Sequence, residues 1–339
     1  MHQHYYNYAL DSIAPCFKNA ATGAEAAQHP AMHHPCSPHR RHPLNPMQNI
    51  VLVAIILFFA ALEIGSRRHK RFHATADDTK LEAFMFLALI AFSQPFIFAV
   101  TGKLCELAMP GQRGAWAELP WWAMAAILLV GDDMTQYGWH RLSHTPLMWP
   151  LHRAHHTAHY MSIRITYRNN FFYYLMMPGL WVSGVLIYMG LGNVYLVYIV
   201  VKLTVILGAH SAVRWDEPLY RIKWLHPLAW VLERTVSTPA THWAHHALTN
   251  DDGIGHYKGN FGNLLFFWDI VFGTAKITRR YPARVGLEDD LVHGKERWFV
   301  EMFYPMFQSR REQSTLVRGR SSTATATEAQ PPHPSRSQA

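Results

Sequence analysis

Five long apolar runs between two polar ends constrain this chain of 339 residues more than any other feature. A helix needs about 20 mostly apolar residues to cross a bilayer, and several of the runs approach that length. Trp and Tyr residues flank the runs, as is typical of membrane interfaces. The alternative is a large soluble domain, but five such runs are hard to bury in a chain of this size. The runs cover residues 50–65, 84–100, 121–131, 171–189 and 194–207.

We therefore expect an all-α, polytopic membrane protein with about four to five transmembrane helices and a cytosol-facing helical cap. Residues 190–193 separate the last two runs with the sequence Gly-Leu-Gly-Asn, which favours a helical hairpin. By the positive-inside rule, the loop after the first run is cytoplasmic, because it contains Arg67, Arg68, Lys70 and Arg71. The following runs then return the chain to the cytoplasmic side, so the histidine clusters described next would all face one compartment.

Three histidine clusters stand out in the second half of the chain. Positions i, i+3 and i+4 of a helix lie on one face, so each cluster directs two or three imidazoles at one point. The alternative is a set of structural or surface histidines, but two HxxHH matches in one chain are not expected by chance. The clusters are His140 and His144; His152, His155 and His156; and His242, His245 and His246.

The donor type of these clusters indicates a transition metal, because Ca²⁺ and Mg²⁺ prefer oxygen ligands. Two tetrahedral zinc ions would use all the clustered imidazoles and leave no open position. Iron with five or six ligands keeps room for oxygen, and insertion of oxygen into an unactivated C–H bond requires a redox-active metal. The donor set and the chemistry therefore favour iron that activates O₂, with O₂ as co-substrate.

The sequence around the clusters resembles the sterol desaturase/fatty acid hydroxylase superfamily. The similar stretches are residues 133–144, 147–156 and 238–246, followed by a closing signature at 260–262, 268–269 and 272–274. The resemblance spans about residues 120 to 275. It implies that the eight clustered histidines hold two irons, that an external electron donor reduces them, and that the centre lies on the cytoplasmic side of four or more membrane helices. After the second cluster, Thr157, Ala158, His159 and Ser162 depart from the family pattern, which leaves the substrate open.

The resemblance also suggests how the chain is divided. We expect a flexible tail over residues 1–47, N-terminal transmembrane helices over 48–119 and a fatty acid hydroxylase-like catalytic domain over 120–280. The remaining segment, 281–339, is expected to be disordered from about residue 309, where Arg, Ser, Thr, Gln and Pro dominate.

Several residues near the clusters are candidates for supporting roles. His210 is a possible additional metal ligand or a structural histidine at the end of an apolar run. Asp133 and Asp269 can orient a ligating imidazole through its second N–H, or they are helix-end carboxylates. Arg168 falls where the family carries an Arg and is a third candidate for the outer shell. Lys202 lies within an apolar run, where we expect its side chain to snorkel to the interface.

Aromatic residues also alternate with apolar ones after the last run, around Trp224, Trp230 and residues 266–268. Two interpretations are open for them. They form interfacial helices that rest on the headgroup region, or they are ordinary packing beneath the metal centre.

The favoured function is an O₂-dependent oxidoreductase that hydroxylates a lipid-like substrate taken from the bilayer, with desaturation as the second reaction. The alternatives are a ring oxidase of the same family, acting on a sterol, carotenoid or hopanoid, and a non-catalytic membrane protein for metal binding or transport. Transport is disfavoured because the clusters flank the apolar runs. The three cysteines and the absence of CxxCH leave no fused electron carrier, so an external reductase is expected. The net charge of +8 follows no stripe along the chain, which argues against nucleic acid.

Overall fold

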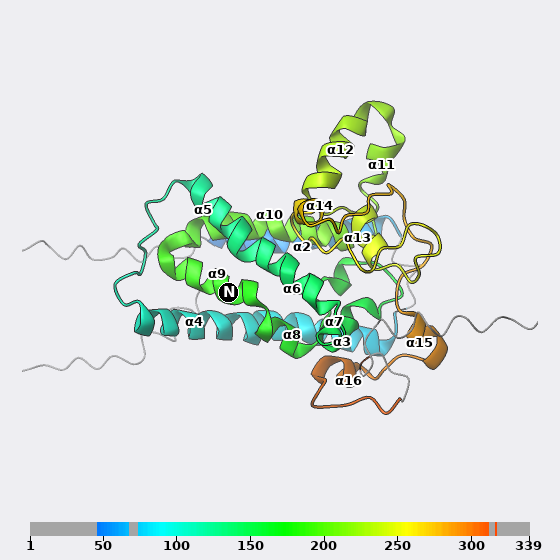
Figure 1. The fold of residues 1–339 in the computed structure, drawn as a ribbon, viewed down its shortest axis with the longest axis horizontal. Helices are drawn as coiled ribbons and strands as arrows, with labels where there is room; N and C mark the ends of the chain where they lie inside the picture. The colour runs from blue at the N-terminus through cyan, green and yellow to red at the C-terminus, as the bar shows by residue number, and fades with distance from the viewer. Residues whose placement is uncertain (1–45, 68–73, 312–315, 317–339) are drawn as a thin grey trace, which may run out of the picture.

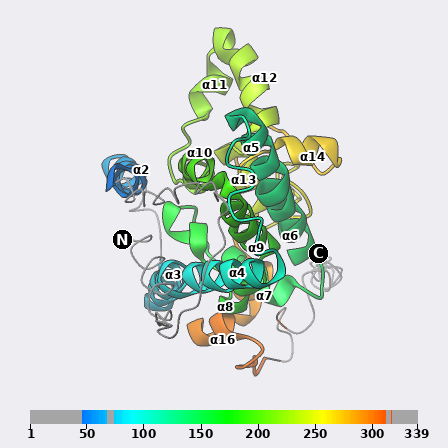
Figure 2. The ribbon, with the colours of Figure 1, turned by 90° about the vertical axis from the view of Figure 1, so that its left-hand side faces the viewer.

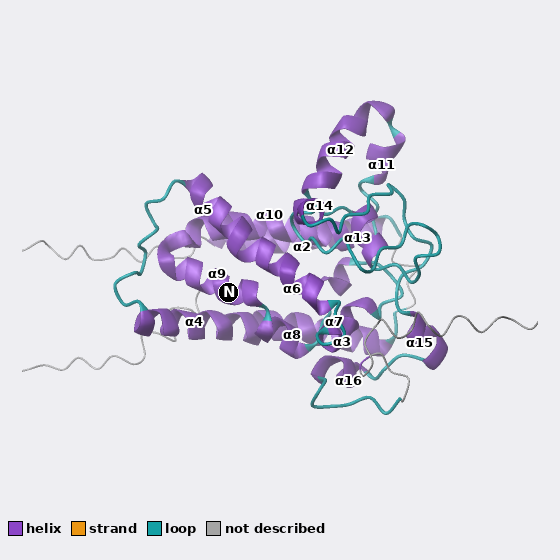
Figure 3. Ribbon diagram, in the orientation of Figure 1, coloured by secondary structure: helices purple, strands orange, loops and turns teal. Residues whose placement is uncertain are grey.

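A computed structural model of the chain describes residues 46–67, 74–311 and 316. Within these residues the structure is helical and has no strand, as predicted (Figure 3). The predicted tails, apart from residues 46–47, 309–311 and 316, lie outside the described residues. So do Arg68, Lys70 and Arg71 of the basic loop.

An elongated bundle of helices forms most of the molecule (Figure 1). Its helices run between one end closed by loops and another end that holds the histidine clusters. Three of the segments contain a π-helical turn, at residues 89–93, 129–134 and 187–191. The bundle consists of α2 (Pro46–Gly65), α3–η2–α4 (Ala76–Ala108), α5–η3–α6 (Trp121–Ser143), α9–η5 (Pro178–Leu191) and α10 (Gly192–His210).

The helical hairpin predicted at residues 190–193 is present and turns at Gly190. This glycine has φ 114°, and a Cβ atom there would lie 2.8 Å from the backbone N of Ala117. Gly179 in α9 lies against Asp132, and Lys202 in α10 pairs with the same carboxylate, so η3 packs against both limbs of the hairpin. Glycine is required at the turn because only it adopts this conformation without strain and fits against the backbone of the facing loop.

Within the described residues, two helical segments, Ala76–Ala108 and Pro178–His210, have the length and hydropathy needed to cross a membrane. This is fewer than the four to five predicted. The second segment includes the turn at Gly190, so α10, with 19 residues, is its longer straight part. The run at 121–131 continues without a break into the polar residues 132–143, and the run at 171–189 is divided at Met177 between α8 (Phe171–Met176) and α9. The first run lies in α2, where the apolar stretch Val53–Gly65 is too short to meet the same criterion. Hydropathy along the sequence locates the apolar stretches but does not show where each helix begins.

Lys202 does not snorkel, contrary to our expectation. Its side chain is buried and forms an ion pair with Asp132, whose Oδ2 also accepts a hydrogen bond of 2.6 Å from the Tyr198 hydroxyl. The π-helical turn η3 (Leu129–Met134) buries Asp132 and its neighbour Asp133 together. A charge among apolar helices is costly unless it is paired, and here the partner comes from the adjacent helix.

Short helices cover the end of the bundle that holds the histidines. The turn η4 (Ile163–Tyr167) lies beside the end of α2, where Glu63 accepts hydrogen bonds from Ser162, Ile163 and Ala212. In the view along the bundle axis, α11 and α12 project sideways from the body (Figure 2). The other covering elements are α7 (Trp149–His156), α11 (Glu217–Arg221), η6 (Lys223–Leu225), α12 (His226–Thr235), α13 (Pro239–His245), α14 (Phe267–Val271), α15 (Glu288–His293) and α16 (Trp298–Phe303).

Candidate metal centre

Nine histidines gather in two adjoining groups at this end of the bundle. Within each group the ligand atoms lie within 4.8 Å of one another. All the rings are buried except His144, which is half-buried. The first group is His140, His144, His152, His156 and His245, and the second is His155, His210, His242 and His246.

Four helices supply these rings, and local sequence fixes where each helix starts or ends. His140 lies in α6, and His144 is the residue that ends it. The helix α7 begins with Trp149-Pro150, and proline is favoured in a first turn because its missing N–H has no helical partner there. Thr238 caps α13 by accepting from the backbone N of Thr241, 3.5 Å away. The helix spacing then directs the rings of α7 and α13 toward each other.

Main-chain carbonyls fix the orientation of several rings. The Nδ1 atoms of His140, His155, His210 and His245 donate to the carbonyl oxygens of Phe261 (2.7 Å), Arg168 (3.1 Å), Ile206 (2.8 Å) and Gly259 (2.7 Å). A carbonyl only accepts, so Nδ1 carries the hydrogen in each of these rings. In a neutral imidazole, Nε2 then presents a lone pair, and it does so toward the interior of the group.

The Nε2 atoms of the second group approach one another closely. His210 Nε2 lies 3.3 Å from His155 Nε2 and 2.9 Å from His242 Nε2, and His246 Nε2 lies 3.1 Å from His242 Nε2. The facing lone pairs of His155 and His210 repel each other unless a cation lies between them. Burial, reinforced by neighbouring rings, holds the pKa of His155 well below its usual range, so protonation does not relieve the repulsion. Nitrogen ligands about 2.1 Å from one metal ion at right angles are about 3.0 Å apart, which matches these separations.

The first group fits a metal ion for a different reason. The Nε2 atoms of His140 and His245 are buried and have no hydrogen-bond partner, and their ring centroids lie 4.7 Å apart. An unpartnered buried polar atom costs free energy, which a bound cation would recover. Burial lowers the pKa of His140 to about 4, so its ring is neutral and able to bind metal at neutral pH. In both groups the ligand atoms are all imidazole nitrogens, a set that suits iron, zinc or copper better than Ca²⁺ or Mg²⁺.

The structure thus brings together the eight histidines predicted as ligands and adds His210 to the second group. Their role as metal ligands stays a prediction, and the grouping refines it. The three sequence clusters do not correspond one to one to the two groups, because the structure distributes their members, together with His210, into groups of five and four. The helix α7 contributes to both groups, because His152 and His156 lie on the side of the first and His155 on the side of the second.

Of the two roles left open for Asp133 and Asp269, the hydrogen bonds fit the one that does not involve an imidazole. Asp269 accepts from the backbone N of Phe261 (2.8 Å) and of Gly262 (2.6 Å), and Asp133 accepts from Trp268 Nε1 (2.8 Å) and the backbone N of Leu265. Because the Phe261 carbonyl accepts from His140, Asp269 acts one step further out, by holding the loop. The carboxylates pair with backbone donors that the sequence does not reveal.

Arg168 lies beside the second group through its backbone, since its carbonyl accepts from His155. Its guanidinium donates to the Ala154 carbonyl (2.8 Å) and to Asp78 (2.8 Å), which ties α7 to the start of α3. Sequence reasoning missed Asn169, whose Oδ1 accepts from His152 Nδ1 at 2.8 Å. The position of Asn169, directly after Arg168, which matches an Arg of the family, was the signal that could have pointed to it. The sequence analysis also assigned no role to the Phe261 carbonyl, although Phe261 belongs to the closing signature.

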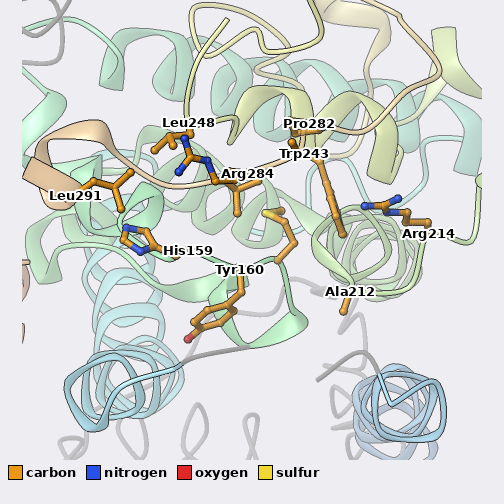
Figure 4. A pocket seen from close by; sticks show the side chains of 12 residues that line it. His159, Tyr160, Ala212, Arg214, Trp243, Leu248, Pro282, Arg284 and Leu291 are labelled. Atoms are coloured by element: carbon orange, nitrogen blue, oxygen red, sulfur yellow. The ribbon is translucent and has the colours of Figure 1, made fainter. Parts of the chain in front are cut away.

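A cavity of about 290 Å³ opens beside the second group (Figure 4). Its walls come from segments that neighbour the histidines, including Ala212, Trp243 and His159. Arg214 lies in this wall with its guanidinium 4.9 Å from the Trp243 ring. None of the nine grouped histidines lines the cavity, so it gives no direct route to them.

Fold and site together define a helical protein with membrane-length apolar segments and a buried histidine-rich centre at one end. Residues 125–274 match the model of the family described as fatty acid hydroxylase. This segment contains all nine grouped histidines, and the family that it matches belongs to the sterol desaturase/fatty acid hydroxylase superfamily, so the predicted resemblance is confirmed. Proteins of the family are membrane-bound, of oxidoreductase type, and use di-iron centres. No solved structure matches the chain.

Proposed function

We propose that this protein is an integral-membrane, O₂-dependent oxidoreductase that uses two iron ions to hydroxylate a C–H bond of a lipid-like substrate. The observation that carries the proposal is the packing of nine imidazoles into two adjoining groups with their Nε2 atoms inward. Two groups of nitrogen ligands suit two metal ions. Imidazole ligands bind iron well, and the proposed oxidation requires a redox-active metal, so we favour iron. The bound irons would supply the activation of O₂, which no side chain performs.

The residues of the chain do the remaining work. The first group would hold one ion and the second group the other, with α7 between them providing His152 and His156 to the first and His155 to the second. The carbonyls of Phe261, Gly259 and Arg168 fix the ring tautomers, and such outer partners raise the basicity of a ligating imidazole. Burial of the rings keeps bulk water from the centre, which would favour attack on the lipid over release of reduced oxygen.

The membrane setting is part of the proposal. The apolar segments would carry the bundle through the bilayer, with the centre on the cytoplasmic side, where the basic loop after α2 also lies. A lipid would reach the centre from the bilayer, and electrons would come from an external donor protein. We also keep the catalytic domain at residues 120–280 as a proposal, and the family match at 125–274 lies inside it.

Desaturation is the second candidate reaction, because it starts with the same hydrogen abstraction and removes a second hydrogen instead of adding oxygen. Oxidation of a sterol, carotenoid or hopanoid ring is a third candidate. Non-catalytic metal binding is the alternative from another class, and it predicts retained metal without a changed lipid.

The test is expression of the full-length chain in a lipid-producing host, followed by mass spectrometry of the extracted lipids. Hydroxylation predicts new species heavier by one oxygen, and desaturation predicts species lighter by two hydrogens. The variants His155→Ala and His245→Ala remove one ring from each group and should abolish the new species. The matched control is His293→Ala, an exposed histidine of α15 that lies outside both groups. A product that survives both group variants refutes the catalytic assignment.

A further inference from the structure

The projecting pair of helices α11 and α12, with the turn η6 between them, bears a row of exposed apolar side chains. We refer to residues 217–235 as the α11–α12 hairpin. Within it, Trp224 is 78% exposed, Trp230 55%, Leu228 48% and Val231 47%. Leu228 and Val231 lie three residues apart in α12 and so share a face. Several large apolar side chains exposed together on one short segment mark it as a binding surface.

Buried hydrogen bonds and ion pairs attach the base of the α11–α12 hairpin to the rest of the protein. These contacts fix the direction in which the hairpin projects. Asp216 is buried and accepts from the backbone N of Ala240 (2.8 Å), at the start of α13. Glu233 is also buried, and its Oε1 pairs with Arg279 at 2.7 Å and with Arg234 at 2.7 Å. The Asp216 contact joins the hairpin to α13, which carries His242 and His245, and the Arg279 pair joins it to the segment after α14.

The exposed face continues onto the bundle. The helix α14 contacts α12 and adds Phe267, Ile270 and Val271, which are 46%, 40% and 53% exposed. Trp268 of the same helix donates from Nε1 to Asp133 at 2.8 Å, which fixes α14 against the bundle. The helices α11, α12 and α14 lie at the end of the molecule that holds the histidines (Figures 1 and 2), so the exposed apolar residues of α14 and of the hairpin are at the same end.

Cations border the apolar face. Arg221 and Lys223 are exposed, and the Arg234 guanidinium lies 4.6 Å from the centre of the Trp230 ring. The two glutamates of the hairpin already have cationic partners, since Glu233 pairs with Arg234 and Glu217 pairs with Arg221 at 2.6 Å. Tryptophan beside Lys and Arg on the edge of an apolar surface is typical of segments that lie in the headgroup region of a bilayer.

We infer that the α11–α12 hairpin lies in the membrane interface, with Trp224, Leu228, Trp230 and Val231 inserted among the lipids. The inference rests on the proposed function, in that the bundle is taken to span the bilayer. A hairpin that projects sideways from the histidine end of such a bundle lies at the level of the headgroups. Its attachment to α13 then sets how far the histidine groups stand from the lipid surface.

The experiment measures how deep a label on the hairpin lies in a bilayer. The full-length chain, with Cys16, Cys36 and Cys105 replaced by Ser, is reconstituted in phosphatidylcholine nanodiscs. Single cysteines at Leu228→Cys, Leu87→Cys and Val292→Cys carry an environment-sensitive fluorophore in separate samples. Leu87 is 58% exposed within the candidate span Ala76–Ala108, and Val292 is 74% exposed on α15, away from the hairpin. Retained metal content shows that each variant is folded.

The inference predicts a blue-shifted emission at Leu228, with quenching that is strongest by lipids labelled near the headgroup. Leu87 should be quenched most by deeply labelled lipids, and Val292 should behave as in water. Trp224→Gln combined with Trp230→Gln should move the Leu228 label toward water, whereas Trp116→Gln at the opposite end should not.

Water-like emission at Leu228 with Leu87 in lipid overturns the inference and leaves the membrane-spanning bundle intact. Water-like emission at Leu87 refutes the spanning bundle itself and removes the basis of the inference. Shielding of Leu228 in detergent dimers as much as in nanodiscs means that a second copy covers the face, which also overturns the inference. A stronger shift when phosphatidylglycerol is added would support contact of the bordering cations with lipid headgroups.

Discussion

His210 Nε2 lies 2.9 Å from His242 Nε2, although the two residues are 32 positions apart and come from different helices. His210 is the last residue of α10, the longer limb of the helical hairpin that turns at Gly190. His242 lies in the short helix α13. Their approach couples the end of a candidate membrane span to the third histidine cluster. Since His210 Nδ1 donates to the Ile206 carbonyl at 2.8 Å, its free nitrogen is fixed toward the second group.

This contact predicts that His210 is needed to retain one of two metal ions. His210→Ala should lose the metal of the second group and keep that of the first, so metal per chain should fall by about half, because the two groups have separate ligand sets. Elemental analysis of the purified protein measures the change. His293→Ala serves as the control and should keep its full metal content. Unchanged metal in His210→Ala would mean that this ring is structural.

Asn169 should act through His152. Asn169→Ala removes the acceptor at 2.8 Å from His152 Nδ1, and loss of such an outer partner typically lowers metal affinity about 10–100-fold. Competition with a chelator of known affinity measures the loss. The control is Asn193→Ala, an exposed asparagine at the opposite end of the bundle. Equal affinity in the two variants would show that the Asn169 amide does not support the ring.

The buried pair of Lys202 and Asp132 should stabilise the bundle only while both members are present. Lys202→Met leaves a buried carboxylate without its cation, which should cost about 3–5 kcal/mol of unfolding free energy. Adding Asp132→Leu should recover much of that loss. Denaturant titration in detergent micelles measures each variant. Lys103→Met changes a pair whose lysine side chain is 64% exposed, so its effect should stay below about 1 kcal/mol. A double variant as unstable as Lys202→Met alone would contradict this account.

Metal binding should depend little on pH near neutrality. Burial lowers the pKa of His140 to about 4 and also holds that of His245 well below its usual range. A proton competes with a metal ion only below the pKa of the ring, so affinity should stay flat between about pH 8 and pH 6 and fall only at more acid pH. Chelator competition across this range measures it. A steady fall in affinity below about pH 6.5 would indicate solvent-exposed rings of ordinary pKa.

Much of the histidine centre could be predicted from the sequence because the spacing of the histidines along each helix is a local pattern. The i, i+3, i+4 spacing of His242, His245 and His246 specifies one helix face, and α13 presents them in that way. The hairpin at Gly190 was also predictable, because a glycine-rich interruption between apolar runs favours a turn.

What could not be predicted depends on contacts between distant parts of the chain. Lys202 was expected to snorkel because its partner Asp132 lies 70 positions away, inside a π-helical turn. For Asp269 the sequence left open an imidazole partner or a helix-end role, and in the structure it accepts from the backbone of residues 261 and 262. Backbone donors and acceptors are present at every position, so a sequence does not show which of them faces a given side chain. The predicted number of membrane-length helices was too high for a related reason. The hydropathy of a run such as 121–131 does not show that the same helix continues into polar residues.

The central claim is that the two histidine groups each hold one redox-active metal ion. Its most direct test is the metal content and the X-ray absorption spectrum of the purified full-length chain, with and without His155→Ala and His245→Ala. The account predicts iron in both groups with nitrogen ligands at about 2.1 Å, and the loss of about half of the iron in each single variant. Iron that is absent from the wild-type chain, or bound equally well after both substitutions, would contradict it.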